Sequence, residues 1–128
     1  MTKSVSTTKQ FIDDAALLEM IEQCAALWRE AVRLDKATVK VRRSGGDPAQ
    51  VKELEARSTQ LVREACSLEW KIAFFNVSSR TGYEAKVSAI RLANFDDCDL
   101  VAIAWQLGRE AERLGIVETP EIASRFRR

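Results

Sequence analysis

The chain contains no histidine among its 128 residues, and this absence removes several kinds of chemistry. Histidine is the usual general base near neutral pH, the commonest metal ligand and the centre of a Ser-His-Asp triad. Phosphotransfer through histidine and the Glu-x-x-His metal sites of helical bundles are excluded for the same reason. A glycine-rich phosphate loop is also missing, because Gly45-Gly46 is a plain turn between helices. We therefore expect a protein that is not an enzyme and that uses no cofactor or metal.

The chain also lacks an excess of either charge. Lys and Arg total 20 and Asp and Glu total 19, so no overall field attracts nucleic acid or an anionic membrane. No apolar run approaches the roughly 20 residues of a membrane span, and the polar residues 1–10 do not form a secretory signal. Three cysteines without a C-x-x-C motif favour reduced thiols. We expect a cytoplasmic protein that has no membrane contact.

Proline and glycine are scarce, with two and five residues, which leaves few breaks and favours long helices. Between residues 51 and 75, eight positions repeat in alternating steps of three and four. They are Val51, Leu54, Ser58, Leu61, Ala65, Leu68, Ile72 and Phe75. This is the spacing of a helix with one narrow apolar stripe that lies along another helix. The sequence therefore predicts an all-α coiled-coil-like fold.

Two long helices, over about 9–41 and 48–75, are predicted to form an antiparallel hairpin. The segment Ser44–Gly46 cannot continue a helix cheaply. Asp47 then caps the second helix, and Pro48 takes its first position, where a missing N–H does no harm. A short loop between two helices with apolar stripes makes such a hairpin. The stripe of the first helix consists of Leu17, Ile21, Cys24, Trp28 and Ala31, widened on one side by Leu18, Ala25 and Val32.

Two shorter helices follow, over about 81–93 and 98–114, and are expected to pack against the hairpin as a four-helix, bundle-like fold. Thr81 and Glu84 have the form of a capping box at the start of the third helix. Gly115 is the expected residue after the fourth helix. We expect Leu61, Leu68, Ile72, Leu100 and Leu107 to be mostly buried. The predicted division is a flexible tail over 1–8, a single helical domain over 9–115 and a C-terminal tail over 116–128, with room for one more turn at 121–126.

Few side chains suggest a chemical site. Cys24 lies on the first stripe and Cys66 beside the second, which favours burial over reactivity. Cys98 lies at a helix N-terminus, where a thiolate is favoured, so its reactivity stays open. Helix capping explains the acidic residues Asp96, Asp97 and Asp99 better than a metal cluster does.

Basic and aromatic residues offer weaker signals. Residues 40–43 and 125–128 form two basic spots that could contact phosphates, although a complement to the helix dipole and a solvated tail explain them better. Trp28, Trp70 and Trp105 all fall on predicted helices, where a core or an interface explains them better than ligand stacking does.

The C-terminal part of the chain carries two short motifs. Gly82, Ala85 and Lys86 match a Thr-Thr-x-x-Gly-x-x-Ala-Lys segment in which Ser78-Ser79 replaces the threonines. A second segment, close to Leu-Ala-Trp-Ser-Leu-x-x-Asp-Leu, is fitted by Ile103, Ala104, Trp105, Leu107 and Glu110, with Gln106 in place of its Ser and Ala111 in place of its last Leu. In these motifs the chain resembles a group of small helical proteins of unassigned function that is common in alphaproteobacterial, especially rhizobial, genomes, often near prophage-like genes. The resemblance implies no activity, but it singles out Gly82, Lys86 and Trp105.

The candidate binding residues are Arg80 and Lys86, near the loop that joins the hairpin to the short helices. The Lys86 ammonium could contact an anion, or it could form an ion pair with a carboxylate of the fourth helix. The sequence favours the ion pair.

We expect the chain to be a protein-interaction module that forms a homodimer and binds another protein in a regulatory or phage-related role. A helix of about 28 residues is about 42 Å long, whereas helices of about 13 and 17 residues reach only about 20 and 25 Å. The short helices therefore leave part of the long stripes uncovered, and a second copy is the commonest cover. Candidate interface residues are Leu17, Ile21, Trp28, Val51 and Leu54. Some of them must serve the seam within the hairpin instead, and the sequence does not say which. The alternative is a nucleic-acid-binding regulator that uses the basic spots.

Overall fold

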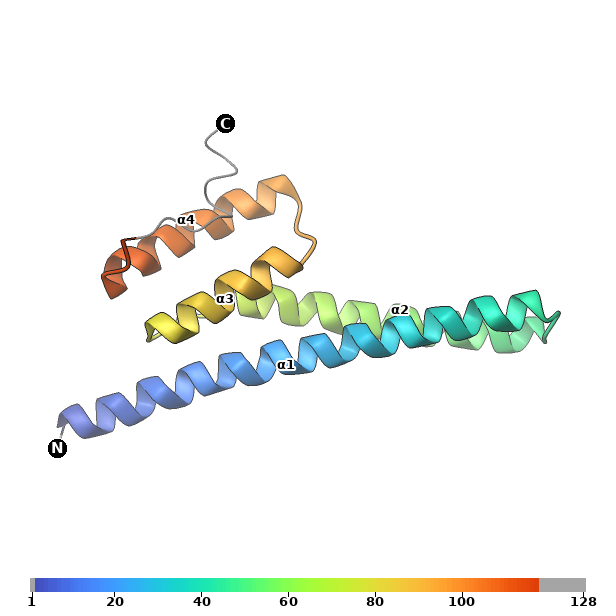
Figure 1. Ribbon diagram of the computed structural model, residues 1–128, viewed down its shortest axis with the longest axis horizontal. Coiled ribbons are helices and arrows are strands. Elements are labelled where there is room, and N and C mark those ends of the chain that lie inside the picture. The colour runs from blue at the N-terminus through green and yellow to red at the C-terminus, as the bar shows by residue number, and fades with distance from the viewer. Residues whose placement is uncertain (1, 118–128) are drawn as a thin grey trace. The chain divides into compact units, whose positions relative to one another are not determined.

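The part of the chain that the structure describes forms four helices joined by short connections (Figure 1). The computed structural model describes residues 2–117, with side chains from residue 14 onward. The helices are α1 (Thr2–Arg43), α2 (Pro48–Ala73), α3 (Arg80–Leu92) and α4 (Asp97–Leu114), and the described residues contain no strand. The predicted all-α fold is confirmed. Within the described part of the chain, no helix is long and apolar enough to cross a membrane.

The helix ends differ from the predicted ones by a few residues. α1 begins at Thr2, so the segment 2–8 that was predicted as a tail is helical. α3 begins at Arg80 rather than Thr81, and its N-cap is Ser79. Gly115 has a φ of 71° after α4, as its predicted role requires. The turn predicted at 121–126 lies outside the described residues, and the predicted division into one domain and two tails stays a prediction.

The chain divides into two compact units. The first, here called the hairpin unit, comprises residues 22–68. The second, here called the α3–α4 unit, comprises the described residues 2–21 and 69–117. Each long helix contributes to both units, and each unit is described below by itself.

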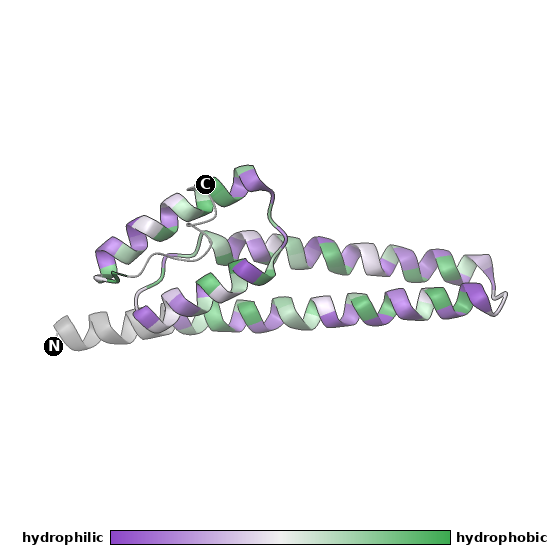
Figure 2. Ribbon diagram, turned by 45° about the horizontal axis from the view of Figure 1, so that its top comes forward, coloured by the Kyte–Doolittle hydropathy of each residue, from purple (hydrophilic) through white to green (hydrophobic). Residues whose placement is uncertain are grey.

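In the hairpin unit, α1 and α2 run antiparallel. The thiol of Cys24 donates to the carbonyl oxygen of Ala65 at 3.5 Å, and the Ser58 hydroxyl donates to Asp35 Oδ1 at 2.8 Å. Nearer the turn, Arg42 Nη2 lies 2.8 Å from Glu55 Oε1. Residues further along α1 therefore pair with residues nearer the start of α2, as in an antiparallel hairpin. Apolar and polar residues recur along both long helices (Figure 2), and the buried side chains of this unit include Ala31, Leu34, Val51 and Ala65.

The predicted turn of the hairpin is confirmed in its details. Asp47 Oδ1 accepts from the backbone N–H of Ala49 at 3.0 Å and so caps α2. Gly45 has a φ of 71°, the left-handed region that glycine adopts without steric cost. The turn could be predicted from the sequence because the residues that form it, Gly45 and Asp47, act on backbone within a few residues of themselves.

The α3–α4 unit has its own apolar core, to which all four helices contribute. Its buried apolar residues include Leu17, Ile72, Val77, Ile90, Ile103 and Leu107. Ile72, Leu100 and Leu107 are buried as predicted. Leu61 and Leu68 keep a minor part of their surface exposed, so they too are mostly buried, although less completely than the other three.

The residues predicted to form a dimer interface fall into two groups. Leu17 has no exposed surface, and Val51 is also buried, so a second chain has almost nothing to cover at either position. Ile21, Trp28 and Leu54 are half-buried. Leu17 and Val51 therefore serve packing within the chain, and the homodimer itself stays a prediction.

Candidate functional site

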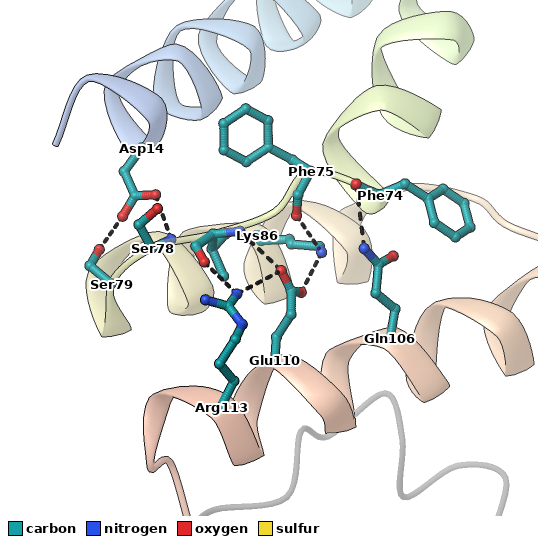
Figure 3. Close-up of polar contacts among 10 residues, drawn as sticks. Asp14, Phe74, Phe75, Ser78, Ser79, Lys86, Gln106, Glu110 and Arg113 are labelled. Carbon is teal, nitrogen blue, oxygen red and sulfur yellow. Dashed lines mark hydrogen bonds and ion pairs between the residues drawn. The ribbon is translucent and has the colours of Figure 1, made fainter. Parts of the chain in front are cut away.

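A buried ion pair joins α3 to α4 within the α3–α4 unit (Figure 3). Lys86 Nζ lies 2.5 Å from Glu110 Oε1, and the two side chains are 0% and 5% exposed. The same ammonium donates to the carbonyl oxygen of Phe75 at 2.8 Å, and Glu110 Oε2 accepts from the backbone N–H of Val77 at 3.0 Å. The ion pair that the sequence favoured for Lys86 is therefore found, and Lys86 is not accessible to an external anion.

The surroundings of this pair alter the acid–base behaviour of two groups. Burial lowers the pKa of the Lys86 ammonium, and its hydrogen bond to Glu110 opposes that change. Burial also raises the pKa of the Tyr83 phenol, and the negative charge of Glu110 adds to that increase. The Tyr83 hydroxyl is buried without a hydrogen-bond partner. Both pKa shifts follow from the burial of these groups in a charged cluster.

Asp14 of α1 fixes the start of α3. Its Oδ1 accepts from the backbone N–H of Ser78 at 2.9 Å, and its Oδ2 accepts from the Ser79 hydroxyl. The Ser79 oxygen in turn accepts from the N–H of Gly82 at 3.0 Å, which makes Ser79 the N-cap. A Cβ on Gly82 would lie 2.6 Å from Asp14 Oδ2, so a side chain at this position would force the Asp14 carboxylate to shift. The predicted capping box at Thr81 is wrong, because α3 begins at Arg80 and Thr81 already lies inside the helix.

The other candidate binding residue, Arg80, lies in a different environment. Its Nε donates to Glu84 Oε1 at 3.0 Å, and both side chains are largely exposed. This is a surface pair one helical turn apart, whereas Lys86 is fully buried. The structure does not bring Arg80 and Lys86 together as one binding site.

Side chains of α4 hold the segment between α2 and α3 through its backbone. Arg113 Nη2 donates to the carbonyl oxygen of Val77 at 2.7 Å, and Gln106 Nε2 donates to that of Phe74 at 3.4 Å (Figure 3). Gln106 Oε1 is buried without a partner. Together with Asp14, Lys86 and Glu110, these contacts tie the segment to three helices. The polar cluster therefore has a structural role.

A groove lies beside this cluster, along α4. It has a volume of about 540 Å³ and contains the side chain of Trp105, which is 70% exposed. We call it the Trp105 groove, and it is lined by Asn76, Ala102, Trp105, Gln106, Arg109, Glu110 and Arg113. The groove thus offers one indole face and two guanidinium groups, which suit an apolar side chain next to an anionic one. The sequence singled out Trp105 but gave no sign of the two arginines beside it.

A second aromatic cluster lies at the end of α2. The rings of Trp70 and Phe74 stack at 5.5 Å, and Phe95 meets Trp70 edge-on at 5.4 Å. Trp70 and Phe74 keep part of their surface exposed. The sequence placed Trp70 on a helix outside the main stripe, and this position matches its partial exposure.

The three cysteines lie in different environments. Cys24 is buried as predicted, whereas Cys66 is exposed, so the prediction of burial is wrong there. Cys98 is also exposed, and none of the three cysteines forms a disulfide. Within the described range, no group of three His, Cys, Asp or Glu residues could hold a metal ion.

No model of a protein family, no curated protein and no solved structure matches the chain.

Proposed function

We propose that the protein is a non-enzymatic, cytoplasmic helical module that binds another protein and works as a homodimer. The observation that supports partner binding most strongly is the exposure of Trp105 in the Trp105 groove. Tryptophan is usually well buried, and Trp and Arg are the residue types most enriched at the energetic centres of interfaces. An exposed indole flanked by Arg109 and Arg113 therefore has the composition of an unoccupied interface centre.

The groove is held in shape by the buried contacts beneath it. Glu110 binds both Lys86 and the N–H of Val77, and Arg113 binds the carbonyl oxygen of Val77. These contacts connect the α4 wall of the groove to the segment that contains Asn76. A surface fixed in this way loses little conformational entropy when a partner binds, which favours affinity.

The charges of the groove indicate what kind of segment would fit. Glu110 is neutralised by Lys86, whereas Arg109 forms no ion pair with any described residue. Arg113 Nη2 donates to the carbonyl oxygen of Val77 and lies 4.0 Å from Glu110 Oε2, so Arg109 is the groove's main charge for an external carboxylate. The best occupant is a segment of another protein that carries a carboxylate next to an apolar side chain. A regulatory or phage-related role rests on the resemblance of the two sequence motifs.

The partner-binding proposal is tested by capture from the native cell with the full-length chain as bait. Trp105→Ala should lose the captured partner, because the indole supplies most of the apolar contact. The matched control is Leu92→Ala, which removes a 90% exposed side chain from α3 outside the groove. Capture that survives Trp105→Ala, or that is lost to the same extent in Leu92→Ala, would contradict the proposal.

One observation favours nucleic-acid binding as a second candidate. Lys36, Lys40 and Arg43 line an open depression of about 660 Å³ on α1, in the hairpin unit. Such a row can contact phosphates, although the chain's net charge of +1 provides little attraction at a distance. This candidate requires retention on DNA or heparin at low salt that is lost by about 200 mM salt and weakened by Lys40→Ala. Absence of retention at low salt would exclude it.

A further inference from the structure

In the hairpin unit, α1 carries a second apolar row outside the hairpin core. Ala25, Val32 and Val39 are exposed, whereas the residue before each of them is buried. Val32 and Val39 are 49% and 44% exposed, which is high for valine. Adjacent residues point about 100° apart on a helix, so this outer row flanks the core seam and does not belong to it.

The spacing of the outer row is that of a coiled-coil seam. Its members repeat every seven residues, and in the sequence Leu18 continues the same spacing towards the N-terminus. Leu18 is also exposed. Single apolar residues on a surface need no explanation, but a regular row along one face of a helix is typical of a surface that another helix covers.

Charged residues share this face and change sign along it. Glu22 lies one turn before Ala25, and Arg29 and Lys36 follow within the row. Residues 22, 25, 29, 32, 36 and 39 alternate in steps of three and four, so they occupy one face of α1. The face is acidic at its N-terminal end and basic at its C-terminal end.

We propose that this face of α1 binds the same face of a second copy, with the two α1 helices antiparallel about a two-fold axis near residues 28 and 29. The proposal rests on the homodimer of the proposed function and names its surface and its orientation. The symmetry places Ala25 opposite Val32 of the second copy, and Val39 opposite position 18, which is leucine. Every apolar member of the outer row then meets another apolar member.

Charge complementarity selects the antiparallel orientation. About the same axis, Glu22 of one copy lies opposite Lys36 of the other, and this pair occurs twice. In a parallel, in-register dimer Glu22 would face Glu22 and Lys36 would face Lys36, which costs affinity. Arg29 lies nearest the axis, where two copies of it approach each other, so the charge test below uses the pair away from the axis.

Sedimentation velocity on the full-length chain tests the surface. The wild-type chain should have twice the mass of one chain at micromolar concentration. Val32→Lys should raise the dimer dissociation constant by about tenfold or more, because it places an unpaired ammonium in the apolar contact. The matched control is Val101→Lys, at a valine of α4 that is 48% exposed, and this variant should remain dimeric.

Charge exchange tests the orientation without touching the apolar row. Glu22→Lys and Lys36→Glu should each weaken the dimer by about tenfold, because each brings like charges together twice. The double variant Glu22→Lys/Lys36→Glu should restore wild-type dissociation, with circular dichroism confirming helicity throughout. These exposed charge changes keep the proposal testable if Val32→Lys fails to fold.

The outcomes separate this inference from the proposed function. A dimer that is indifferent to Val32→Lys, or a double variant that stays as weak as the single ones, overturns the α1 interface but leaves a homodimer through another surface. A wild-type chain that sediments as a monomer overturns both the interface and the homodimer. Partner binding through the Trp105 groove is then decided separately by the capture experiment.

Discussion

The ammonium of Lys86 lies 2.5 Å from the carboxylate of Glu110, although the two residues are 24 positions apart and both side chains are buried. This pair connects α3 to α4, and the second oxygen of Glu110 holds the N–H of Val77 at 3.0 Å. Each charge thus has a charged partner and a backbone partner. The pair lies beneath the Trp105 groove, so its integrity determines the shape of the proposed binding surface.

Removal of one member of the pair should be strongly destabilising. Lys86→Met removes the close counter-charge of the buried Glu110 carboxylate and leaves only the more distant Arg113 at 4.0 Å, and we expect a loss of about 3–5 kcal/mol in the free energy of unfolding. The double variant Lys86→Met/Glu110→Leu should recover part of that loss, because no buried charge remains. Urea denaturation measures both values. As a control, Arg80→Ala removes an exposed ion pair and should cost at most about 1 kcal/mol.

A side chain at position 82 should conflict with Asp14. A Cβ there would lie 2.6 Å from Asp14 Oδ2, so we expect Gly82→Ala to cost about 1–3 kcal/mol. The matched control is Gly108→Ala in α4, where no heavy atom lies within 4 Å of the added carbon and helix propensity should raise stability by about 0.5–1 kcal/mol. Thermal unfolding compares the two variants. Equal effects at both positions would contradict the close contact with Asp14.

Tyr83 should titrate above its ordinary pKa. Its folded-state pKa is raised from 10.0 by burial and by the charge of Glu110. Above pH 10 the unfolded chain therefore releases a proton that the folded chain retains, and the free energy of unfolding falls as the pH rises. Tyr83 is the only tyrosine of the chain, so the ultraviolet absorbance of tyrosinate reports it alone. An ordinary pKa in the folded protein would show that the phenol is hydrated.

Tyr83→Phe gives a second measurement on the same group. The hydroxyl is buried without a hydrogen-bond partner, so its removal should raise stability at neutral pH by about 1 kcal/mol. The variant should also lose the decline in stability above pH 10 that Tyr83 causes. A variant that is clearly less stable than the wild type at neutral pH would indicate an unseen partner of the hydroxyl.

Burial should decide the cost of leucine truncations. Leu107 has no exposed surface, and Leu107→Ala should cost about 2–5 kcal/mol. Leu68 is half-buried, so Leu68→Ala should cost less than that. Leu92→Ala should leave the urea midpoint nearly unchanged because Leu92 is mostly exposed. A large effect at Leu92 would place that side chain in an assembly contact.

Local determinants made much of the fold predictable. The hairpin turn depends on Gly45 and Asp47, whose roles are set by nearby backbone. Apolar spacing predicted the burial of Ile72 and Leu107. The same spacing predicted that Leu61 is mostly buried, and most of its surface is covered.

The candidate site depended on contacts that spacing does not encode. Ser79 and Thr81 are both residue types that suit a helix N-cap. The structure uses Ser79, whose hydroxyl also binds Asp14, 65 residues away in the sequence. The sequence favoured an ion pair between Lys86 and a carboxylate of the fourth helix, but only the packing of α3 on α4 selects Glu110. Exposure of Trp105 could not be read from its helical position, since buried and exposed tryptophans share the same local pattern.

The central claim, that the Trp105 groove binds another protein, is tested most directly by cross-linking in the native cell. A photoreactive amino acid at position 102, where an exposed alanine lines the groove, should form a covalent adduct with one partner protein. The same amino acid at position 92 on α3 should form none. Adducts from neither position, or the same adducts from both, would contradict the claim.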